Sequence, residues 1–223
     1  MSADTQRQVD ISNRLRQLYS GALTDIMDEM GYRNQMLPND IRPLDPTAKV
    51  AGPAFTVRGR VRTADPADDP RFKQMEMLEA IRPPCVVLVD GGDETTAAHW
   101  GELMSTIARE NGATGAIIAG GLRDSQLILD MGFPVFRRFH SPLTAVWRFE
   151  QVDYQLPVKL GSVVVRPGDY LFGDIDGCIV LPKEIVLAVL EKAEEVVRKE
   201  RIVFAELRQG ANMRDLFAKY KVF

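Results

Sequence analysis

The sequence is short of the residues that build transition-metal centres and disulfide frameworks. Its 223 residues include only two histidines, His99 and His140, and two cysteines, Cys85 and Cys178. Two histidines exclude a multi-histidine metal site, so a bound metal would be held mainly by oxygen ligands, which Mg²⁺ and Mn²⁺ prefer. The cysteines lie far apart in separate apolar segments. We therefore expect both to be buried and reduced, as in a cytoplasmic protein.

The chain also lacks long apolar runs and an excess of basic residues. No stretch reaches the roughly 18 apolar residues that a membrane span needs, and residues 1–15 have no apolar segment of the signal-peptide type. Lys and Arg number 28 against 31 Asp and Glu, which gives a net charge of −3. Proteins that bind nucleic acid through phosphate neutralisation usually carry a basic excess. We expect neither nucleic acid nor a membrane as partner.

The central part of the chain alternates between buried strands and amphipathic helices. Apolar runs at 85–90, 114–121 and 134–139 predict strands, and the segments 100–112 and 124–132 between them predict helices. This alternation is typical of an α/β fold with a parallel sheet and crossover helices.

The flanking segments differ from this core. Residues 9–31 predict two helices divided at Gly21, and residues 152–181 are rich in β-branched residues and turns. We expect one domain over 1–223, with a helical N-terminus at 9–31, an α/β core at about 49–182, and a C-terminal helix and tail at 183–223. A strand at 49–63 and a helix at 71–81 complete the predicted core.

The most informative motif is Gly120-Gly121-Leu122-Arg123-Asp124, which directly follows a predicted strand. Loops at the carboxyl ends of parallel strands meet at the ligand crevice. Arg123 offers a planar fork of donors for a carboxylate, and Asp124 can bind a hard cation. The structural alternative is a surface turn in which Asp124 caps a helix. The motif lacks the Gly-x-Gly-x-x-Gly pattern of dinucleotide sites and the Gly-Lys ending of a P-loop.

Glu102 lies in the first turn of the preceding helix, where a carboxylate is also favoured by the helix dipole alone. A functional interpretation places it across the crevice from Asp124, because both residues begin helices that follow neighbouring strands. One arginine and two carboxylates would suit a metal-assisted site for an anionic keto acid. We expect His99 and His140 to have structural roles.

Several motifs in fixed order resemble the RraA-like family. They are LTDIMDEMG (23–31), AGPAFTV (51–57), WGEL (100–103), GATGAIIAGGLRDS (112–125), GFPVF (132–136), VVRPGDYLFGDIDGCIVLP (164–182) and KAEEVVRKE (192–200). This family contains the divalent-metal-dependent aldolases of 4-hydroxy-4-methyl-2-oxoglutarate and 4-carboxy-4-hydroxy-2-oxoadipate. The resemblance implies a swivelling β/β/α fold, assembled as a homotrimer or homohexamer with active sites between subunits.

The resemblance also implies roles for residues of this chain. Arg123 would bind the carboxylate and keto oxygen of the substrate, and Asp124 would ligate Mg²⁺ or Mn²⁺. Glu102 would hold metal-bound water, although many relatives have Asp at this position. Leu127 is a second departure, because many relatives carry an acid there. These two departures leave the exact substrate open.

Further site residues follow from the same resemblance. The family places a glutamate from the C-terminal helix of one subunit near the site of the next. Glu200 of the partner subunit fits best and Glu195 of the partner subunit is the alternative. Gly101, Leu103 and Met104 would bind the substrate carboxylate at the helix start, the latter two through their backbone N–H groups.

The activity implied is the cleavage of a 4-hydroxy-2-oxo acid to pyruvate and a second oxo product, with oxaloacetate decarboxylation as a side activity. Branched 4-hydroxy diacids and sugar-derived 2-keto-3-deoxy acids both remain open as substrates. The alternative is a binding protein, because some members of the family regulate ribonuclease E through protein–protein contact. That alternative does not require Arg123 and Asp124.

Overall fold

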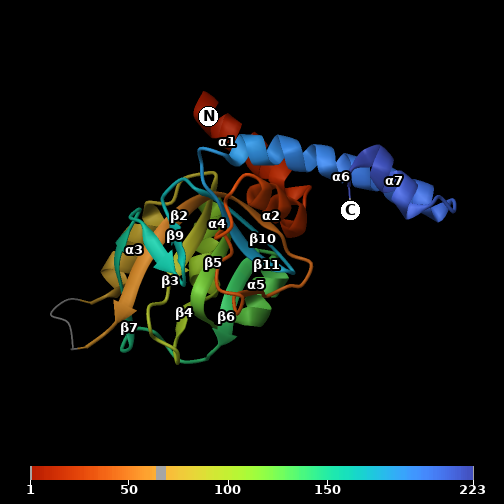
Figure 1. Ribbon diagram of the computed structural model, residues 1–223. Helices are drawn as coiled ribbons and strands as arrows, with labels where there is room; N and C mark the ends of the chain where they lie inside the picture. The colour runs from red at the N-terminus through yellow and green to blue at the C-terminus, as the bar shows by residue number, and fades with distance from the viewer. Residues whose placement is uncertain (1, 64–68, 223) are drawn as a thin grey trace.

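The computed structural model describes residues 2–63 and 69–222. A mixed sheet forms the body of the molecule, and the terminal helices gather at one end of it (Figure 1). The strand order is β1-β6-β5-β3-β2-β10-β11, with β4 paired to β5 and β7 paired to β2. This mixed α/β architecture confirms the predicted fold class.

The centre of the sheet is parallel, as the alternation of strands and helices predicts. Its strands are β2 (Val50–Val61), β3 (Cys85–Asp90), β5 (Ala113–Leu122) and β6 (Val135–His140). Neighbouring strands run parallel in the order β2-β3-β5-β6. Because both faces of these strands are covered, their sequences are nearly continuous apolar runs.

The predicted β-rich segment after residue 150 adds antiparallel strands. The strand β7 (Phe149–Tyr154) pairs with the end of β2, while β10 (Tyr170–Asp174) pairs with its beginning and with β11 (Gly177–Leu181). The remaining strands are short: β1 (Arg42–Pro43), β4 (Ala98–Trp100), β8 (Val158–Leu160) and β9 (Val163–Val165).

The helices form two groups. The helices α3 (Arg71–Glu79), α4 (Glu102–Glu110) and α5 (Ser125–Met131) belong to the body, and their buried residues share one hydrophobic core with the parallel strands. The helices α1 (Ala3–Arg16), α2 (Ser20–Glu29) and α6 (Val186–Arg208) share a second core with β10 and β11. In Figure 1 this helical end lies at the top, with α7 (Met213–Tyr220) at the far end of α6.

The prediction that Gly21 divides the two N-terminal helices was wrong. The break lies at Gln17–Tyr19, and Gly21 is inside α2. The buried carboxylate of Asp174 accepts hydrogen bonds from the N–H and the hydroxyl of Ser20, at 2.8 and 2.9 Å, which fixes the start of α2. A contact 154 residues away in the sequence therefore decides a boundary that the local pattern places elsewhere.

Two other boundaries differ from prediction. Trp100 ends the short strand β4 rather than beginning a helix, because Ala98 and Trp100 pair with the end of β5. The expected C-terminal tail contains α7, whose first turn is capped by the Asn212 side chain.

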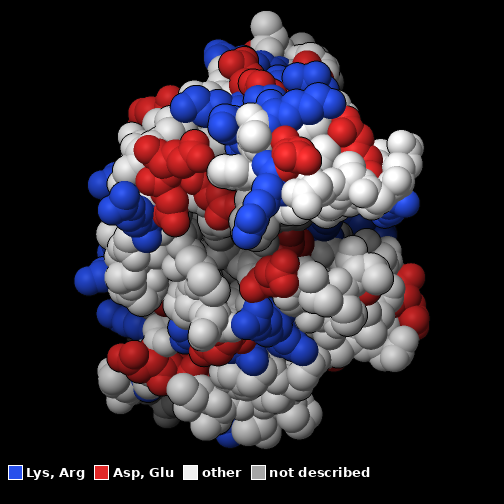
Figure 2. All heavy atoms as spheres, turned by 45° about the vertical axis from the view of Figure 1, so that its right-hand side comes forward, with Lys and Arg blue, Asp and Glu red and all other residues white. Residues whose placement is uncertain are grey.

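The cysteines are buried free thiols, as predicted. Burial raises the pKa of Cys85 to about 12 and raises that of Cys178 as well, so both thiols are protonated. Within residues 2–63 and 69–222, no helix is both long enough and apolar enough to cross a bilayer. On the face seen in Figure 2, blue basic side chains are interleaved with red acidic ones, in agreement with the nearly balanced charge.

Candidate active site

The parallel strands end together at one edge of the sheet, and a cavity of about 310 Å³ opens there. Trp100 of β4 and His140 of β6 both align with Leu122, the last residue of β5. Five of the predicted site residues line this cavity: Gly101, Leu103, Met104, Arg123 and Asp124. The structure thus brings together residues from two successive strand–helix connections, as the topology of parallel sheets requires.

Asp124 links the two connections through its side chain. It follows β5 with a φ of 58°, in the left-handed region that few residues other than glycine, asparagine and aspartate adopt. Its Oδ2 atom accepts a hydrogen bond from the backbone N–H of Glu102, at 3.2 Å. The Asp124 side chain does not cap its own helix, the structural alternative for this motif, and instead accepts a hydrogen bond at the start of α4.

The glycine at position 101 lets this carboxylate stay close to the start of the helix, and a larger residue would displace it. A Cβ atom at Gly101 would lie 2.6 Å from Asp124 Oδ2 and 3.2 Å from Arg123 Cγ. The backbone of Gly101 is extended, with φ −156° and ψ −171°, so the constraint comes from space and not from backbone conformation. The predicted Gly101 is therefore the position that lets Asp124 approach the helix.

The first turn of α4 presents backbone donors to the cavity. The Asp124 side chain caps only the Glu102 N–H, and the N–H groups of Leu103 and Met104 have no acceptor among the residues that the structure describes. Unpaired N–H groups at the start of a helix bind anions, because they add to the positive end of the helix dipole. The site can accordingly hold a carboxylate.

Arg123 supplies the positive charge of the site. Its backbone N–H donates to Trp100 O at 3.1 Å, which ties the end of β5 to β4. Its guanidinium Nε lies 3.5 Å from Asp124 Oδ2, and 45% of the side chain is exposed. The guanidinium is consequently accessible from the cavity and lies beside a carboxylate.

The Glu102 carboxylate has no hydrogen bond or ion pair with the described residues. Glu102 contacts Asp124 only through its backbone N–H. Glu102 is the first residue of α4, as predicted. Leu127 is 51% exposed on α5 and is not part of the cavity wall.

The two glutamates expected to serve a neighbouring site lie on α6, away from the cavity of their own chain. Glu200 accepts a hydrogen bond from the Tyr19 hydroxyl; burial, and then this bond, raise the pKa of Tyr19. Glu195 pairs with Lys199 at 2.8 Å, which lowers the pKa of Glu195. Neither glutamate reaches Arg123 within one chain.

The donors at the cavity fit a hard divalent cation better than a softer metal. In the described part of the chain, no group of three or more His, Cys, Asp and Glu side chains is placed to hold a metal ion. Asp124 nevertheless provides a carboxylate at the cavity wall, while Glu102, the next acid on the neighbouring element, is not among the residues that line the cavity. Mg²⁺ is commonly bound through one or two carboxylates and keeps several waters, so this donor set suits Mg²⁺ or Mn²⁺.

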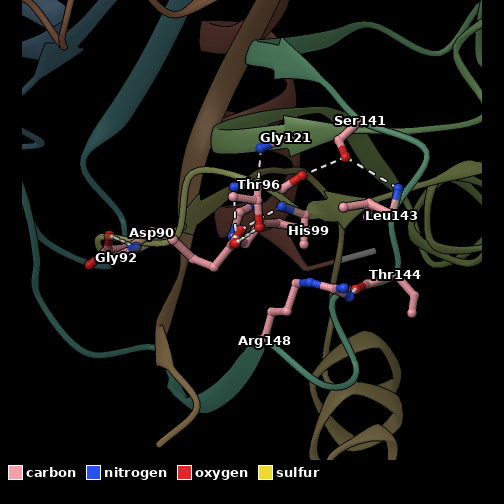
Figure 3. Close-up of polar contacts among 11 residues, drawn as sticks. Asp90, Gly92, Thr96, His99, Gly121, Ser141, Leu143, Thr144 and Arg148 are labelled. Atoms are coloured by element: carbon pink, nitrogen blue, oxygen red, sulfur yellow. Dashed lines mark hydrogen bonds and ion pairs between the residues drawn. The ribbon is translucent and has the colours of Figure 1, made fainter.

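A buried network supports the end of β5, where Gly120 and Gly121 lie (Figure 3). His99 Nδ1 accepts a hydrogen bond from the Gly121 N–H at 2.9 Å, and His99 Nε2 lies 3.4 Å from Glu94 Oε2. Burial lowers the pKa of His99, and Glu94 only partly opposes this shift, so the imidazole is neutral. A Cβ atom at Gly120 would lie 2.4 Å from His99 Nδ1. The hydrogen bond to Gly121 is a structural contact of the kind expected for His99, and the residue also lines the cavity.

His140 lies on the other side of Arg123 and Asp124, in a second cavity of about 370 Å³ that these two residues share. Its Nε2 accepts a hydrogen bond from Arg137 Nε at 3.1 Å, and its Nδ1 lies 2.8 Å from Ser125 Oγ. Burial and the nearby Arg137 lower the pKa of His140.

Sequence reasoning missed the far wall of the cavity. Phe149, Glu150 and Gln151 come from β7, and Arg71 and Gln74 from α3. These residues carry no motif, and antiparallel pairing of β7 with the end of β2 brings Phe149, Glu150 and Gln151 to the site. Only a three-dimensional arrangement could have identified them.

Comparison with known proteins identifies related sequences. A sequence model of the RraA-like family, Aldolase/RraA, matches residues 20–180. A protein of Halalkalibacterium halodurans with the provisional name 4-hydroxy-4-methyl-2-oxoglutarate aldolase is 28% identical over 191 residues, which are 86% of this chain and 85% of that protein. Protein DlpA of Legionella pneumophila is 24% identical over 204 residues, or 90% of this chain, but the chain spans only 32% of its length.

Solved structures share the fold. A crystal structure described as one of novel cellulases from microbes associated with the gut ecosystem has 34% identity and a TM-score of 0.81, with 86% of both chains covered. RraAS2 of Streptomyces coelicolor, described as an unusual member of the RNase ES inhibitor RraA protein family, has 24% identity and a TM-score of 0.74, covering 88% of this chain and 96% of that chain. At that identity, the second similarity supports the fold alone.

Proposed function

The chain belongs to the RraA-like family, and from this premise we propose that it is a carbon–carbon lyase that cleaves a 4-hydroxy-2-oxo acid to pyruvate and a second oxo product. The observation that carries the proposal is the placement of Arg123 and Asp124 beside the unpaired N–H groups of Leu103 and Met104, at the mouth of one cavity. The provisional aldolase name of a relative points to the same chemistry.

The 2-oxo acid end of the substrate would bind at the start of α4. Its carboxylate would accept hydrogen bonds from the N–H groups of Leu103 and Met104, and the Arg123 guanidinium would donate to the carboxylate and the keto oxygen. Such contacts with a charged group are stronger than neutral hydrogen bonds and fix the orientation of the substrate.

A divalent cation would be held by Asp124. The Asp124 carboxylate accepts one hydrogen bond, from the Glu102 N–H, and would keep lone pairs for the cation. Glu102 and Glu200 of the partner subunit would hold waters around it, with Glu195 of the partner subunit as the alternative, in a homotrimer or homohexamer. Bound Mg²⁺ or Mn²⁺ would supply Lewis-acid stabilisation of the negative charge that develops on the keto oxygen.

Proton transfer is assigned to Glu102, acting through a water that its carboxylate holds. This water would take the proton of the 4-hydroxyl group, the C3–C4 bond would break, and C4 would become the carbonyl of the second product. The electron pair of the broken bond would form the enolate of pyruvate, which Arg123 would stabilise through charge-assisted hydrogen bonds. Return of the proton to C3 would give pyruvate.

The same enolate forms when oxaloacetate loses carbon dioxide, so oxaloacetate tests the reaction without knowledge of the natural substrate. We expect the chelator-stripped protein to release pyruvate from oxaloacetate above the metal-only background when Mg²⁺ or Mn²⁺ is added. Arg123→Ala and Asp124→Ala should each abolish this release, while Arg7→Ala on the remote helix α1 should not.

The folding of each variant would be checked by circular dichroism and its assembly by sedimentation. Full activity in a folded Arg123→Ala variant would refute the site. Absence of release by the folded wild type with either metal would refute the lyase, and would turn attention to the inhibitory binding described for RraA proteins.

A further inference from the structure

The inner end of the cavity contains a buried amide without a partner. Gln151 of β7 lines the cavity, and only 6% of this residue is exposed. Neither Nε2 nor Oε1 of Gln151 has a hydrogen-bond partner among the residues that the structure describes. Buried polar groups are nearly always paired, because an unpaired donor or acceptor loses its hydration without compensation. An amide with both atoms unpaired therefore points to a missing partner at this position.

The position of Gln151 is fixed by the strand. Phe149 and Gln151 lie two residues apart on β7, so both side chains project from the same face. Phe149 packs edge-on against the His99 ring, with ring centroids 4.4 Å apart, and both rings are buried. Gln151 thus stands beside an apolar wall at the closed end of the cavity, while Arg123 and Leu103 form its open end.

The charges of the cavity wall decide which polar group suits this closed end. Among the described residues that line the cavity, the cations are Arg71 and Arg123. Arg71 is already paired with Asp69, and Arg123 belongs to the pyruvyl end of the proposed site. The neighbouring Glu150 is acidic and pairs with Arg60 outside the wall, at 2.6 Å. A second carboxylate of a substrate would find no unpaired cation among these lining residues, whereas a hydroxyl group can both donate to and accept from an amide.

We propose that the closed end of the cavity binds the part of the substrate that becomes the second oxo product, and that Gln151 selects substrates with a hydroxyl group on that part. The substrate class is then a 4-hydroxy-2-oxo acid with an uncharged, hydroxylated tail, and not a dicarboxylate. Gln151 is a specificity residue in this assignment, since it contacts the tail and takes no part in bond cleavage. The inference rests on the proposed lyase function.

The test compares three substrates that share the reacting atoms and differ only in the tail. They are 4,5-dihydroxy-2-oxopentanoate, 4-hydroxy-2-oxopentanoate and 4-hydroxy-2-oxopentanedioate, with hydroxymethyl, methyl and carboxylate tails. We expect the Mg²⁺-loaded wild type to favour the hydroxymethyl tail in kcat/KM by about tenfold over each of the others, the effect of one well-placed hydrogen bond. Gln151→Met, which keeps the length of the side chain without its amide, should lose this preference, mainly through a higher KM. Gln6→Met on α1 is the matched control and should retain it.

Oxaloacetate separates the failure of this inference from the failure of the lyase. Its leaving part is only carbon dioxide, so Gln151→Met should release pyruvate from oxaloacetate at close to the wild-type rate. If the wild type cleaves oxaloacetate but favours the methyl or carboxylate tail, the inference is overturned and the lyase stands. A hydroxyl preference that survives in Gln151→Met overturns the role of Gln151. Absence of oxaloacetate turnover in the folded wild type overturns both.

Discussion

The substitution Gly101→Ala tests how closely the Asp124 carboxylate must approach the start of α4. The new Cβ atom would lie 2.6 Å from Asp124 Oδ2, and carbon and oxygen atoms at this position do not approach within 3.0 Å. The carboxylate must therefore retreat by at least 0.4 Å (3.0 − 2.6). Since the hydrogen bond from the Glu102 N–H already measures 3.2 Å, a retreat away from the helix breaks it.

The substitution should change the activity more than the stability of the protein. Losing one partly exposed hydrogen bond to a charged group costs about 1 kcal/mol of the free energy of unfolding. Replacing glycine by alanine recovers about 0.5–1 kcal/mol through the unfolded state, because the extended backbone of Gly101 suits alanine. Stability should therefore change by less than about 1 kcal/mol. Activity is more sensitive, because a displacement of about 1 Å in a catalytic group costs about 100-fold in rate. For the smaller retreat of the Asp124 carboxylate we expect the rate of pyruvate release to fall by about tenfold.

The assay is pyruvate release from oxaloacetate with saturating Mg²⁺, together with urea unfolding of the same samples. Gly21→Ala is the matched control, because Gly21 lies inside α2 and its nearest non-neighbour atoms belong to the Tyr19 side chain. We expect the control to keep full activity. Full activity in a stably folded Gly101→Ala variant would show that the position of Asp124 does not limit the reaction.

Two further predictions concern stability. Ser20→Ala removes one of the three hydrogen bonds that the buried Asp174 carboxylate accepts and should lower the free energy of unfolding by about 1.5–3 kcal/mol in urea titrations, with little effect on activity per folded molecule; no loss would mean that this pair does not anchor α2. Burial lowers the pKa of His99 below its ordinary value of 6.5, so below about pH 6.5 the unfolded chain binds a proton that the folded chain does not. The free energy of unfolding should therefore decrease as the pH is lowered, by at most about 1.4 kcal/mol per pH unit for this group. In His99→Asn, whose side-chain oxygen can still accept from the Gly121 N–H, this pH dependence should become shallower, and an unchanged profile would exclude His99 as its source.

The parallel core could be predicted because its sequence signals are local. The run from Cys85 to Val89 is buried along its whole length, and Gly120 and Gly121 lie close to the end of β5. The division of the N-terminal helices could not be predicted, since the Asp174 carboxylate that fixes Ser20 lies far away in the sequence. Local patterns specify that an element forms, whereas long-range contacts specify where it begins.

The candidate site divides in the same way. Arg123 and Asp124 could be identified from their motif, and parallel topology brings them to the start of α4. Gln151 could not be identified, because its neighbours in the sequence give no sign that β7 turns this side chain toward a cavity. The part of the site that the motif describes is the part proposed for the shared pyruvyl unit. The part that no motif describes is the part proposed for selectivity.

The separation of the helical end from the cavity has an evolutionary consequence. The segment shared with the family, residues 20–180, begins after α1 and ends before α6. These two helices are tied to each other, by the Arg14–Glu194 ion pair at 2.7 Å and by a hydrophobic core that excludes the cavity wall from α3 and β7. A lineage can lengthen or shorten α1 without altering the residues at the cavity, whereas α6 carries the Glu200 and Glu195 proposed to serve the site of the partner subunit. The first helix and the cavity are thus free to diverge at different rates.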